Sequence, residues 1–232
     1  MPEGNFFHYD QAAVDHLARK DKKLAAAMQA IGPVRREVMP DLFQALMHAI
    51  TGQQISMAAQ RTVWGRLCGL LGEVTPQALL AQPQTALQAL GLSARKVDYM
   101  RGIARQVVDG ELDLPGMAAL EDAEVCRRLA ALRGIGVWTA EMLLLFSLQR
   151  PDILSYDDLA IRRGLRMLYR HKEMPRERFE RYRRRFSPYG SLASLYLWAI
   201  AGGALPELDD PAERKRGRPP PAASLKSTVT KD

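Results

Sequence analysis

The chain has 232 residues, of which 47% are hydrophobic and 25% are charged, and its formal net charge is +7. The isoelectric point of the sequence is about 9.6. This length fits one large domain or two small ones, and the composition excludes a fibrous or wholly disordered chain. The basic balance is compatible with a polyanionic partner, and equally with an ordinary basic globular protein.

The spacing of cysteine and histidine implies no zinc or iron–sulfur site. Cys68 and Cys126 have no C-x-x-C spacing, and the four histidines are scattered along the chain. The N-terminus lacks the segments of a signal peptide, and the most apolar stretch, Leu192 to Leu205, is too short to span a bilayer. We therefore expect no membrane partner and a cytoplasmic protein, associated with the nucleoid if the source is bacterial.

Apolar residues recur at helical spacing almost throughout, and no strand series is evident. This pattern predicts an all-α fold of about ten helices joined by short loops. In chain order, the expected helical segments are Val14 to Met28, those that begin after the candidate N-caps Asp41, Ser56, Thr75 and Ser93, and then residues 121–131, 137–148, 158–169, 176–186 and 188–201.

Residues 1–206 are expected to form the folded domain, and residues 207–232 a disordered basic tail. The tail offers little for a core, because it consists largely of Asp209-Asp210-Pro211, Lys215-Arg216-Gly217-Arg218 and Pro219-Pro220-Pro221. Its basic cluster is interpreted first as a solvated tail and second as a contact for DNA phosphates.

A glycine-containing turn separates two of the expected helices at residues 132–136. The sequence Leu132-Arg133-Gly134-Ile135-Gly136 runs directly into Val137-Trp138-Thr139-Ala140. Glycines permit a sharp turn and a close approach of backbone N–H groups to a ligand, and the next helix directs its positive dipole end to the same place. The segment therefore predicts a helix–hairpin–helix that suits a phosphate, with a plain helix–helix turn as the alternative.

Two adjacent acids, Asp157 and Asp158, precede the following helix. At such a position capping is the favoured interpretation, since both acids suit the helix dipole. Capping and chemistry are compatible, because one aspartate can cap the helix while the other faces a pocket.

Two tryptophans and two glutamines are further candidate residues, which could contact a nucleobase. Trp138 and Trp198 lie on otherwise aliphatic helices, where core packing is the default, but an indole also stacks well on a cationic ring or a flipped-out base. Gln53 and Gln54 lie in a tight loop between helices. They are either solvent-facing or inserted into a duplex, where glutamine can bond to the base left unpaired.

Ten arginines lie between residues 159 and 186, directly after the aspartate pair. Glutamates are interleaved among them, so part of this set is expected to be a salt-bridged surface, and individual phosphate contacts are not assigned. The arginines are Arg162, Arg163, Arg166, Arg170, Arg176, Arg178, Arg181, Arg183, Arg184 and Arg185.

Taken in order, these motifs resemble the helix–hairpin–helix DNA glycosylase superfamily, and within it the 3-methyladenine DNA glycosylase II, or alkylbase, branch. The resemblance covers roughly Gln11 to Leu205. Its motifs are G-Q-x-I/V-S at Gly52–Ser56, L-x-G-I-G-x-W-T-A at Leu132–Ala140, D-D-x-x-I at Asp157–Ile161, and L-W at Leu197-Trp198.

The resemblance implies two lobes with an active-site cleft between them. It also implies a monofunctional enzyme of base excision repair, which flips out alkylated bases such as 3-methyladenine and 7-methylguanine and hydrolyses the N-glycosidic bond. The expected partner is double-stranded DNA containing damaged bases, bound by a monomer, and no cofactor is required.

The resemblance also implies roles for individual residues. Asp158 is the expected catalytic residue, with Asp157 as a helper or cap, and Trp138, Trp198 and Met142 line the substrate pocket. Trp138 stands where bifunctional relatives carry a Schiff-base lysine, so no lyase activity is expected.

DNA contacts are implied for the hairpin and for the loop after the first motif. The wedge that enters the duplex falls on Gln53 or Gln54, and the alkylbase alignment favours Gln54. The amides of Gly134 and Gly136 are expected to hold a phosphate, next to Thr139. A monovalent cation, K⁺ or Na⁺, is expected on the backbone carbonyls of Ala130, Leu132 and Ile135.

Three departures from the alkylbase pattern put the substrate range in question. The extra N-terminal α/β domain of the best-known member has no room here, Met142 replaces a pocket tyrosine, and glutamine replaces an aliphatic wedge. Two alternatives stay open: a glycosylase for other damaged or mismatched bases, and a non-catalytic helix–hairpin–helix DNA-binding module, which would share the hairpin and the basic surface.

Overall fold

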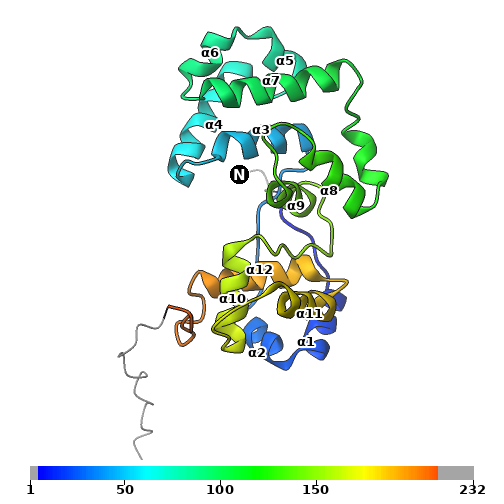
Figure 1. The fold of residues 1–232 in the computed structure, drawn as a ribbon, viewed down its shortest axis with the longest axis vertical. Coiled ribbons are helices and arrows are strands. Elements are labelled where there is room, and N and C mark those ends of the chain that lie inside the picture. The colour runs from blue at the N-terminus through cyan, green and yellow to red at the C-terminus, as the bar shows by residue number, and fades with distance from the viewer. Residues whose placement is uncertain (1–4, 214–232) are drawn as a thin grey trace, which may run out of the picture.

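The computed structural model describes residues 5–213. This part of the chain is helical, with an isolated β-bridge between Phe6 and Glu37 and no longer strand, which confirms the all-α prediction (Figure 1). The helices are α1 (Gln11–Lys20), α2 (Lys22–Ile31), α3 (Leu42–Gly52), α4 (Met57–Leu71), α5 (Pro76–Ala81), α6 (Gln84–Ala89), α7 (Ala94–Val108), the 3-10 helix η1 (Pro115–Ala119), α8 (Asp122–Ala130), α9 (Val137–Phe146), α10 (Leu159–Tyr169), α11 (Arg176–Phe186) and α12 (Gly190–Ala201).

The helical region expected from Val14 to Met28 is present as two helices, because Asp21 divides it into α1 and α2. The backbone of Asp21 is extended, and its N–H donates to the Leu17 carbonyl at the end of α1. Its carboxylate accepts from the N–H groups of Lys23 and Leu24 at 3.0 and 2.9 Å, which starts α2. Asp21 thus serves both helix ends, through its backbone N–H at the end of α1 and through its carboxylate at the start of α2. Pro83 is the N-cap of α6, next to the end of α5, and makes no side-chain capping bond.

Four predicted N-caps are confirmed. Each side-chain oxygen accepts the N–H of the third residue after it, so the orphan donors of the first turn are partly satisfied. The capping residues are Asp41, Ser56, Thr75 and Ser93.

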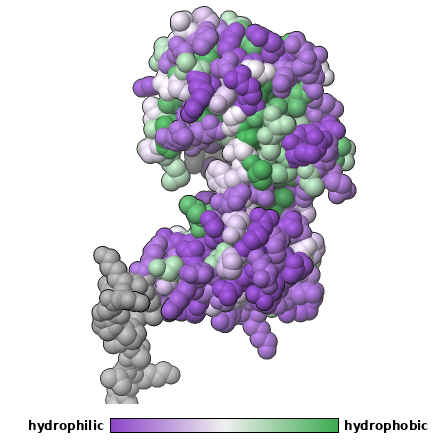
Figure 2. All heavy atoms as spheres, viewed as in Figure 1, coloured by the Kyte–Doolittle hydropathy of each residue, from purple (hydrophilic) through white to green (hydrophobic). Residues whose placement is uncertain are grey.

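The helices form two lobes, each around its own hydrophobic core (Figure 1). The first core is built mainly by α3 to α9, and the second by α1, α2 and α10 to α12. Figure 2 shows the molecule narrowing between the lobes, with hydrophobic side chains gathered near this waist. Trp198 packs against both cores. Among the described helices, none is long and apolar enough to cross a membrane.

Close contact between α10 and α12 depends on Gly164. A Cβ atom at Gly164 would lie 2.3 Å from the backbone carbonyl oxygen of Leu197, closer than any real contact. Trp198 follows Leu197 directly on α12, and Asp158 caps α10. The absence of a side chain at Gly164 therefore sets the spacing between two predicted site residues.

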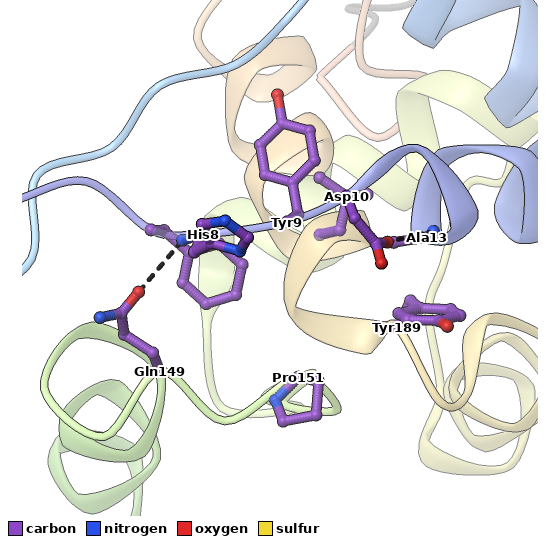
Figure 3. Close-up of a pocket in the computed structure, with 9 residues that line it drawn as sticks. His8, Tyr9, Asp10, Ala13, Gln149, Pro151 and Tyr189 are labelled. Atoms are coloured by element: carbon purple, nitrogen blue, oxygen red, sulfur yellow. Dashed lines mark hydrogen bonds between the residues drawn. The ribbon is translucent and has the colours of Figure 1, made fainter.

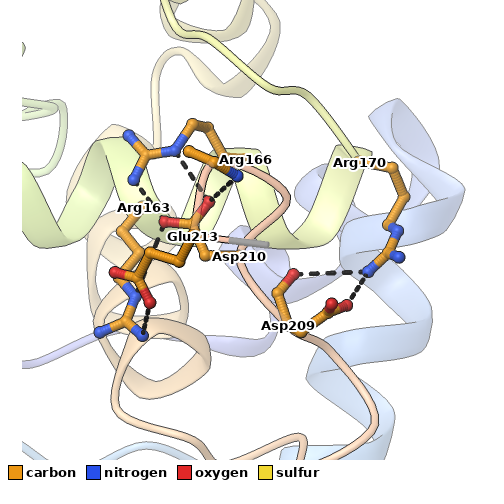
Figure 4. Close-up of polar contacts among 7 residues, drawn as sticks. Arg163, Arg166, Arg170, Asp209, Asp210 and Glu213 are labelled. Atoms are coloured by element: carbon orange, nitrogen blue, oxygen red, sulfur yellow. Dashed lines mark hydrogen bonds and ion pairs between the residues drawn. The ribbon is translucent and has the colours of Figure 1, made fainter. Parts of the chain in front are cut away.

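The acidic segment after α12 is folded against α10. Asp209, Asp210 and Glu213 pair with Arg170, Arg166 and Arg163 respectively (Figure 4). The expectation that a disordered tail begins at residue 207 is therefore wrong for residues 207–213, and the remaining tail, 214–232, lies outside the described residues. These pairs also engage three arginines of the predicted basic set.

Asp210 is the buried centre of this segment. Its side chain is fully buried and accepts from Arg166 Nε at 3.0 Å and Nη2 at 2.5 Å, and from the N–H of Ala212 at 3.0 Å. Burial alone would raise the pKa of this carboxyl, but these hydrogen bonds and the charges of Arg166 and Arg163 outweigh it and lower the pKa. The stability that the pair contributes is therefore present above the ordinary aspartate pKa of about 3.9 and is lost as the pH falls below it.

We expect Gly164→Ala to lower the free energy of unfolding by about 1–3 kcal/mol, because the new methyl group collides with backbone. Gly65→Ala is the matched control: Gly65 is exposed within α4 and has no neighbour within 4 Å of the added Cβ, so the change should raise stability by about 0.5–1 kcal/mol. Urea unfolding followed by circular dichroism compares the two. Equal stability of both variants would contradict the close-contact interpretation.

Asp210→Ala leaves Arg166 partly buried without its partner, so the free energy of unfolding at neutral pH should fall by about 3 kcal/mol. The difference from the wild type should shrink as the pH drops below about 3.9. The control is Asp209→Ala, whose pair with Arg170 is nearly half exposed, so it should cost less than about 1 kcal/mol. Urea unfolding across this pH range measures both. A pH-independent deficit in Asp210→Ala would show that the ion pair is not the cause.

Candidate active site

The predicted helix–hairpin–helix is present as α8, a turn at residues 131–136, and α9. Gly134 has φ +88°, and a Cβ there would lie 2.3 Å from the Tyr99 ring, so both backbone conformation and space require glycine. Gly136 forms the N-cap of α9 without a side-chain cap. The first turn of α9 therefore presents free N–H groups to an anion, and Thr139 lies on that turn.

Asp158 lies at the waist between the lobes and is 6% exposed. Its Oδ1 accepts the N–H of Ile161 at 2.8 Å, which caps α10. The same oxygen accepts the indole N–H of Trp198 at 3.1 Å, and Oδ2 accepts that of Trp138 at 3.0 Å. Three N–H donors hold the carboxylate in one orientation and stabilise its negative charge.

Of the two roles expected for Asp157, helper or cap, the structure gives the cap to Asp158. Asp157 is exposed and makes no capping bond, while Asp158 both caps α10 and faces the tryptophans. Asp157 lies near enough to Glu141 for its charge to act on that residue. The two roles that were expected to be shared between the aspartates, capping the helix and facing the pocket, are thus both taken by Asp158.

The two tryptophans are presented differently. Trp138 is 46% exposed, so part of its ring is open to a ligand. Trp198 is half-buried and stacks on Phe146, with ring centroids 5.4 Å apart, so one of its faces is covered. Arg36 lies with its guanidinium carbon 6.0 Å from the centroid of Trp198. Met142 follows Trp138 by one turn of α9 and is half-buried, so it lies on the same side of that helix.

The structure separates the two glutamines of the loop after α3. Gln53 donates through Nε2 to the backbone carbonyl of Gly134 at 2.7 Å and is half-buried. Gln54 has φ +57° and is exposed, as is Ile55 beside it. The hairpin and this loop therefore lie side by side, with Gln54 directed away from the fold.

The expected cation ligands are backbone carbonyls around the hairpin. Ala130 ends α8, and the carbonyl of Leu132 accepts the N–H of Ile135 at 3.0 Å, which leaves one lone pair on that oxygen. Within residues 5–213, no group of three or more histidine, cysteine or acidic side chains could hold a metal. Oxygen donors of this kind suit a hard cation, so the residues present fit K⁺ or Na⁺.

Glu141 is a residue at this site that the sequence reasoning missed. It lies on α9 three residues after Trp138 and accepts a hydrogen bond from Ser155, in the segment that leads to Asp158. Burial raises the pKa of Glu141, and the charge of Asp157 adds to this. The signal was available in the helical spacing, since a residue three positions after Trp138 shares its side of the helix.

A separate cavity of about 180 Å³ lies where the N-terminal segment meets the second lobe (Figure 3). Two of its polar groups are already engaged: the N–H of His8 donates to Gln149 at 3.0 Å, and Asp10 caps α1. Asp158 and the two tryptophans do not line it. The chemistry-bearing residues are thus at the waist and not in this cavity.

The fold and this site define the class of protein. Residues 47–188 match the family described as "HhH-GPD superfamily base excision DNA repair protein", and the chain belongs to that superfamily. It is 30% identical over 191 residues to DNA-3-methyladenine glycosylase 1 of Schizosaccharomyces pombe, which covers 79% of this chain and 84% of that protein. It is also 30% identical over 173 residues to DNA-3-methyladenine glycosylase 2 of Escherichia coli, covering 70% of this chain and 58% of that protein.

Solved structures agree with this placement. The crystal structure of DNA-3-methyladenine glycosidase from Bacillus halodurans has a TM-score of 0.77 and 34% identity, covering 85% of this chain and 93% of that one. The 3-methyladenine DNA glycosylase of Schizosaccharomyces pombe in complex with abasic DNA has a TM-score of 0.71 and 30% identity, covering 81% and 95%. The predicted family is therefore confirmed.

Proposed function

We propose that this chain is a monofunctional DNA glycosylase. It flips alkylated bases of the 3-methyladenine and 7-methylguanine type out of double-stranded DNA and hydrolyses their N-glycosidic bond. The observation that carries the proposal is the carboxylate of Asp158, held at the waist by the indoles of Trp138 and Trp198 beside the helix–hairpin–helix. The relatives named for 3-methyladenine support the choice of substrate.

Asp158 would act on the sugar and not on the base. An alkylated purine is cationic and leaves readily with the electrons of the C–N bond, so little acid catalysis is needed. The sugar then carries oxocarbenium-like charge, which a fixed carboxylate stabilises. Oδ2 accepts a single bond, from Trp138, so it keeps a lone pair to face the sugar or to orient the water that adds to C1′.

Trp138 would receive the flipped base. Its exposed indole face attracts a cationic ring, and Met142 adds a polarizable neighbour one helical turn away. Trp198 offers at most its second face, since Phe146 covers the first. Trp138 cannot form an imine, so the enzyme would leave an abasic site without cutting the strand.

The DNA would be held by the hairpin and opened by the loop after α3. The amides of Gly134 and Gly136, with Thr139, would bind a phosphate at the start of α9. K⁺ or Na⁺ would be held by the carbonyls named above and would supply positive charge toward that phosphate. Exposed Gln54 would fill the space that the flipped base leaves. A monomer suffices for this arrangement.

We expect Asp158→Asn to abolish most base release while keeping the fold, because asparagine is nearly as good an N-cap as aspartate. Loss of the fixed charge should lower the single-turnover rate by about 100-fold or more. The substrate is a duplex oligonucleotide with one alkylated base, and strand breaks are scored with and without hot alkali. Breaks that need alkali in the wild type, and that vanish in Asp158→Asn, support a monofunctional glycosylase.

Other outcomes of that assay would redirect the proposal. Breaks without alkali would mean lyase activity and would contradict the role of Trp138. Intact DNA binding with no release of any alkylated base would favour the non-catalytic DNA-binding module. Release confined to oxidised or mismatched bases would favour the other glycosylase class.

Trp138→Phe separates stacking from hydrogen bonding. Phenylalanine keeps an aromatic face but loses the N–H that holds Oδ2 of Asp158. Since a hydrogen bond to a charged group contributes about 1.5–3 kcal/mol, kcat should fall about 10- to 100-fold with KM nearly unchanged. Trp138→Ala should raise KM as well, because the stacking face is also lost. Steady-state base release measures both, with Trp64→Phe as the control; wild-type kcat in Trp138→Phe would exclude an orienting role for the indole.

A further inference from the structure

Gln53 differs from Gln54 in what its side chain touches. Its Nε2 group donates to the backbone carbonyl of Gly134 at 2.7 Å, across 81 residues of sequence. Gln53 is also the C-cap of α3, and its N–H donates to the Ile50 carbonyl, so its backbone is fixed to that helix. A side chain anchored in this way is not available to enter a duplex.

The acceptor of this bond, the carbonyl of Gly134, belongs to a peptide group whose orientation affects the conformation of the hairpin. The carbonyl of Gly134 and the N–H of Ile135 belong to the same peptide group, and that N–H donates to the Leu132 carbonyl at 3.0 Å. Both ends of this peptide are therefore held. The amides of Gly134 and Gly136 lie on either side of it, and neither makes a hydrogen bond to another described residue. The orientation of the peptide that Gln53 holds thus sets the direction of the two amides proposed to bind phosphate.

Helix α7 contacts the chain on both sides of the Gln53 hydrogen bond, at the end of α3 and at the hairpin. Lys96 donates through Nζ to the Thr51 carbonyl at 2.9 Å, in the last turn of α3. The Tyr99 ring, one turn along α7, leaves no room for a Cβ at Gly134. Arg133 of the hairpin lies over the same ring and pairs with Asp98 at 3.1 Å. The loop and the hairpin are therefore packed on one helix and joined to each other by one hydrogen bond.

We propose that Gln53 is a positioning residue that makes the loop carrying Gln54 and the phosphate-binding hairpin one rigid unit. When the hairpin grips a phosphate, Gln54 is then already aimed at the base pair to be opened, because the loop cannot shift relative to the hairpin. This inference rests on the proposed function, since it assumes that DNA occupies both elements. Glutamine suits the task because it has both the length and a donor; methionine has the length without a donor, and glutamate would set an acceptor against the carbonyl.

The test compares Gln53→Met and Gln53→Glu with Gln44→Met, a matched change on α3 at a half-buried glutamine that makes no hydrogen bond through its side chain to a described residue. Single-turnover base release is measured with the enzyme in saturating excess on two duplexes, one with the alkylated base paired and one with it opposite an abasic site. Loss of one neutral hydrogen bond should slow Gln53→Met about 3- to 10-fold on the paired lesion. The unpaired lesion needs no opening and should be released within about twofold of the wild-type rate.

A double-mutant cycle distinguishes positioning from a general loss. If Gln53 acts through Gln54, then Gln53→Met should add little to the defect of Gln54→Ala, so the two effects should not multiply. Equal slowing on both duplexes, or multiplying effects, would mean that Gln53 serves stability or binds DNA by itself. A Gln53→Met rate equal to that of Gln44→Met would overturn the proposal.

Affinity for a duplex with an abasic site is measured in parallel. This measurement distinguishes failure of the proposed glycosylase function from failure of the proposed role of Gln53. Release of no alkylated base by the wild type would overturn the proposed function. The affinity would still test the connection, because Gln53→Met and Gln53→Glu should bind this duplex about 3- to 10-fold more weakly than Gln44→Met. Unchanged affinity and unchanged rates in an active wild-type background would overturn the connection alone.

Discussion

The carboxylate of Asp158 is bound by one indole N–H from each lobe, and this pair of hydrogen bonds connects the two lobes at the candidate active site. Trp138 comes from α9 in the first lobe and Trp198 from α12 in the second. Asp158 itself caps α10, so the same oxygen that receives Trp198 also starts a helix. The position of this carboxylate is thus fixed by the start of α10 and by tryptophans from two other helices.

Local features were predicted well because their causes are local. A serine, threonine or aspartate before an apolar run caps a helix wherever the chain lies, as at Asp41 and Ser93. The glycines of the hairpin and the order of the motifs were equally visible. Asp21 was missed since the apolar spacing continues across it, and only its extended backbone ends α1.

Features that depend on distant partners could not be predicted in this way. Asp210 lies in a segment whose composition is typical of a solvated tail. Its burial depends on its pairing with Arg166, 44 residues earlier in the chain. The roles of Gln53 and Gln54 differ through the positive φ of Gln54 and the position of Gly134, neither of which a single sequence reveals. The covered face of Trp198 likewise depends on Phe146, a residue of another helix.

The chain has three tryptophans, and two of them donate their indole N–H groups to the same carboxylate. The third, Trp64, packs edge-on against His48 in the first lobe. Intrinsic fluorescence of this protein is therefore weighted toward Asp158 and its surroundings. A ring that stacks on Trp138 would alter the emission of the unlabelled protein, so binding of a ligand at Trp138 can be followed by tryptophan fluorescence without a label.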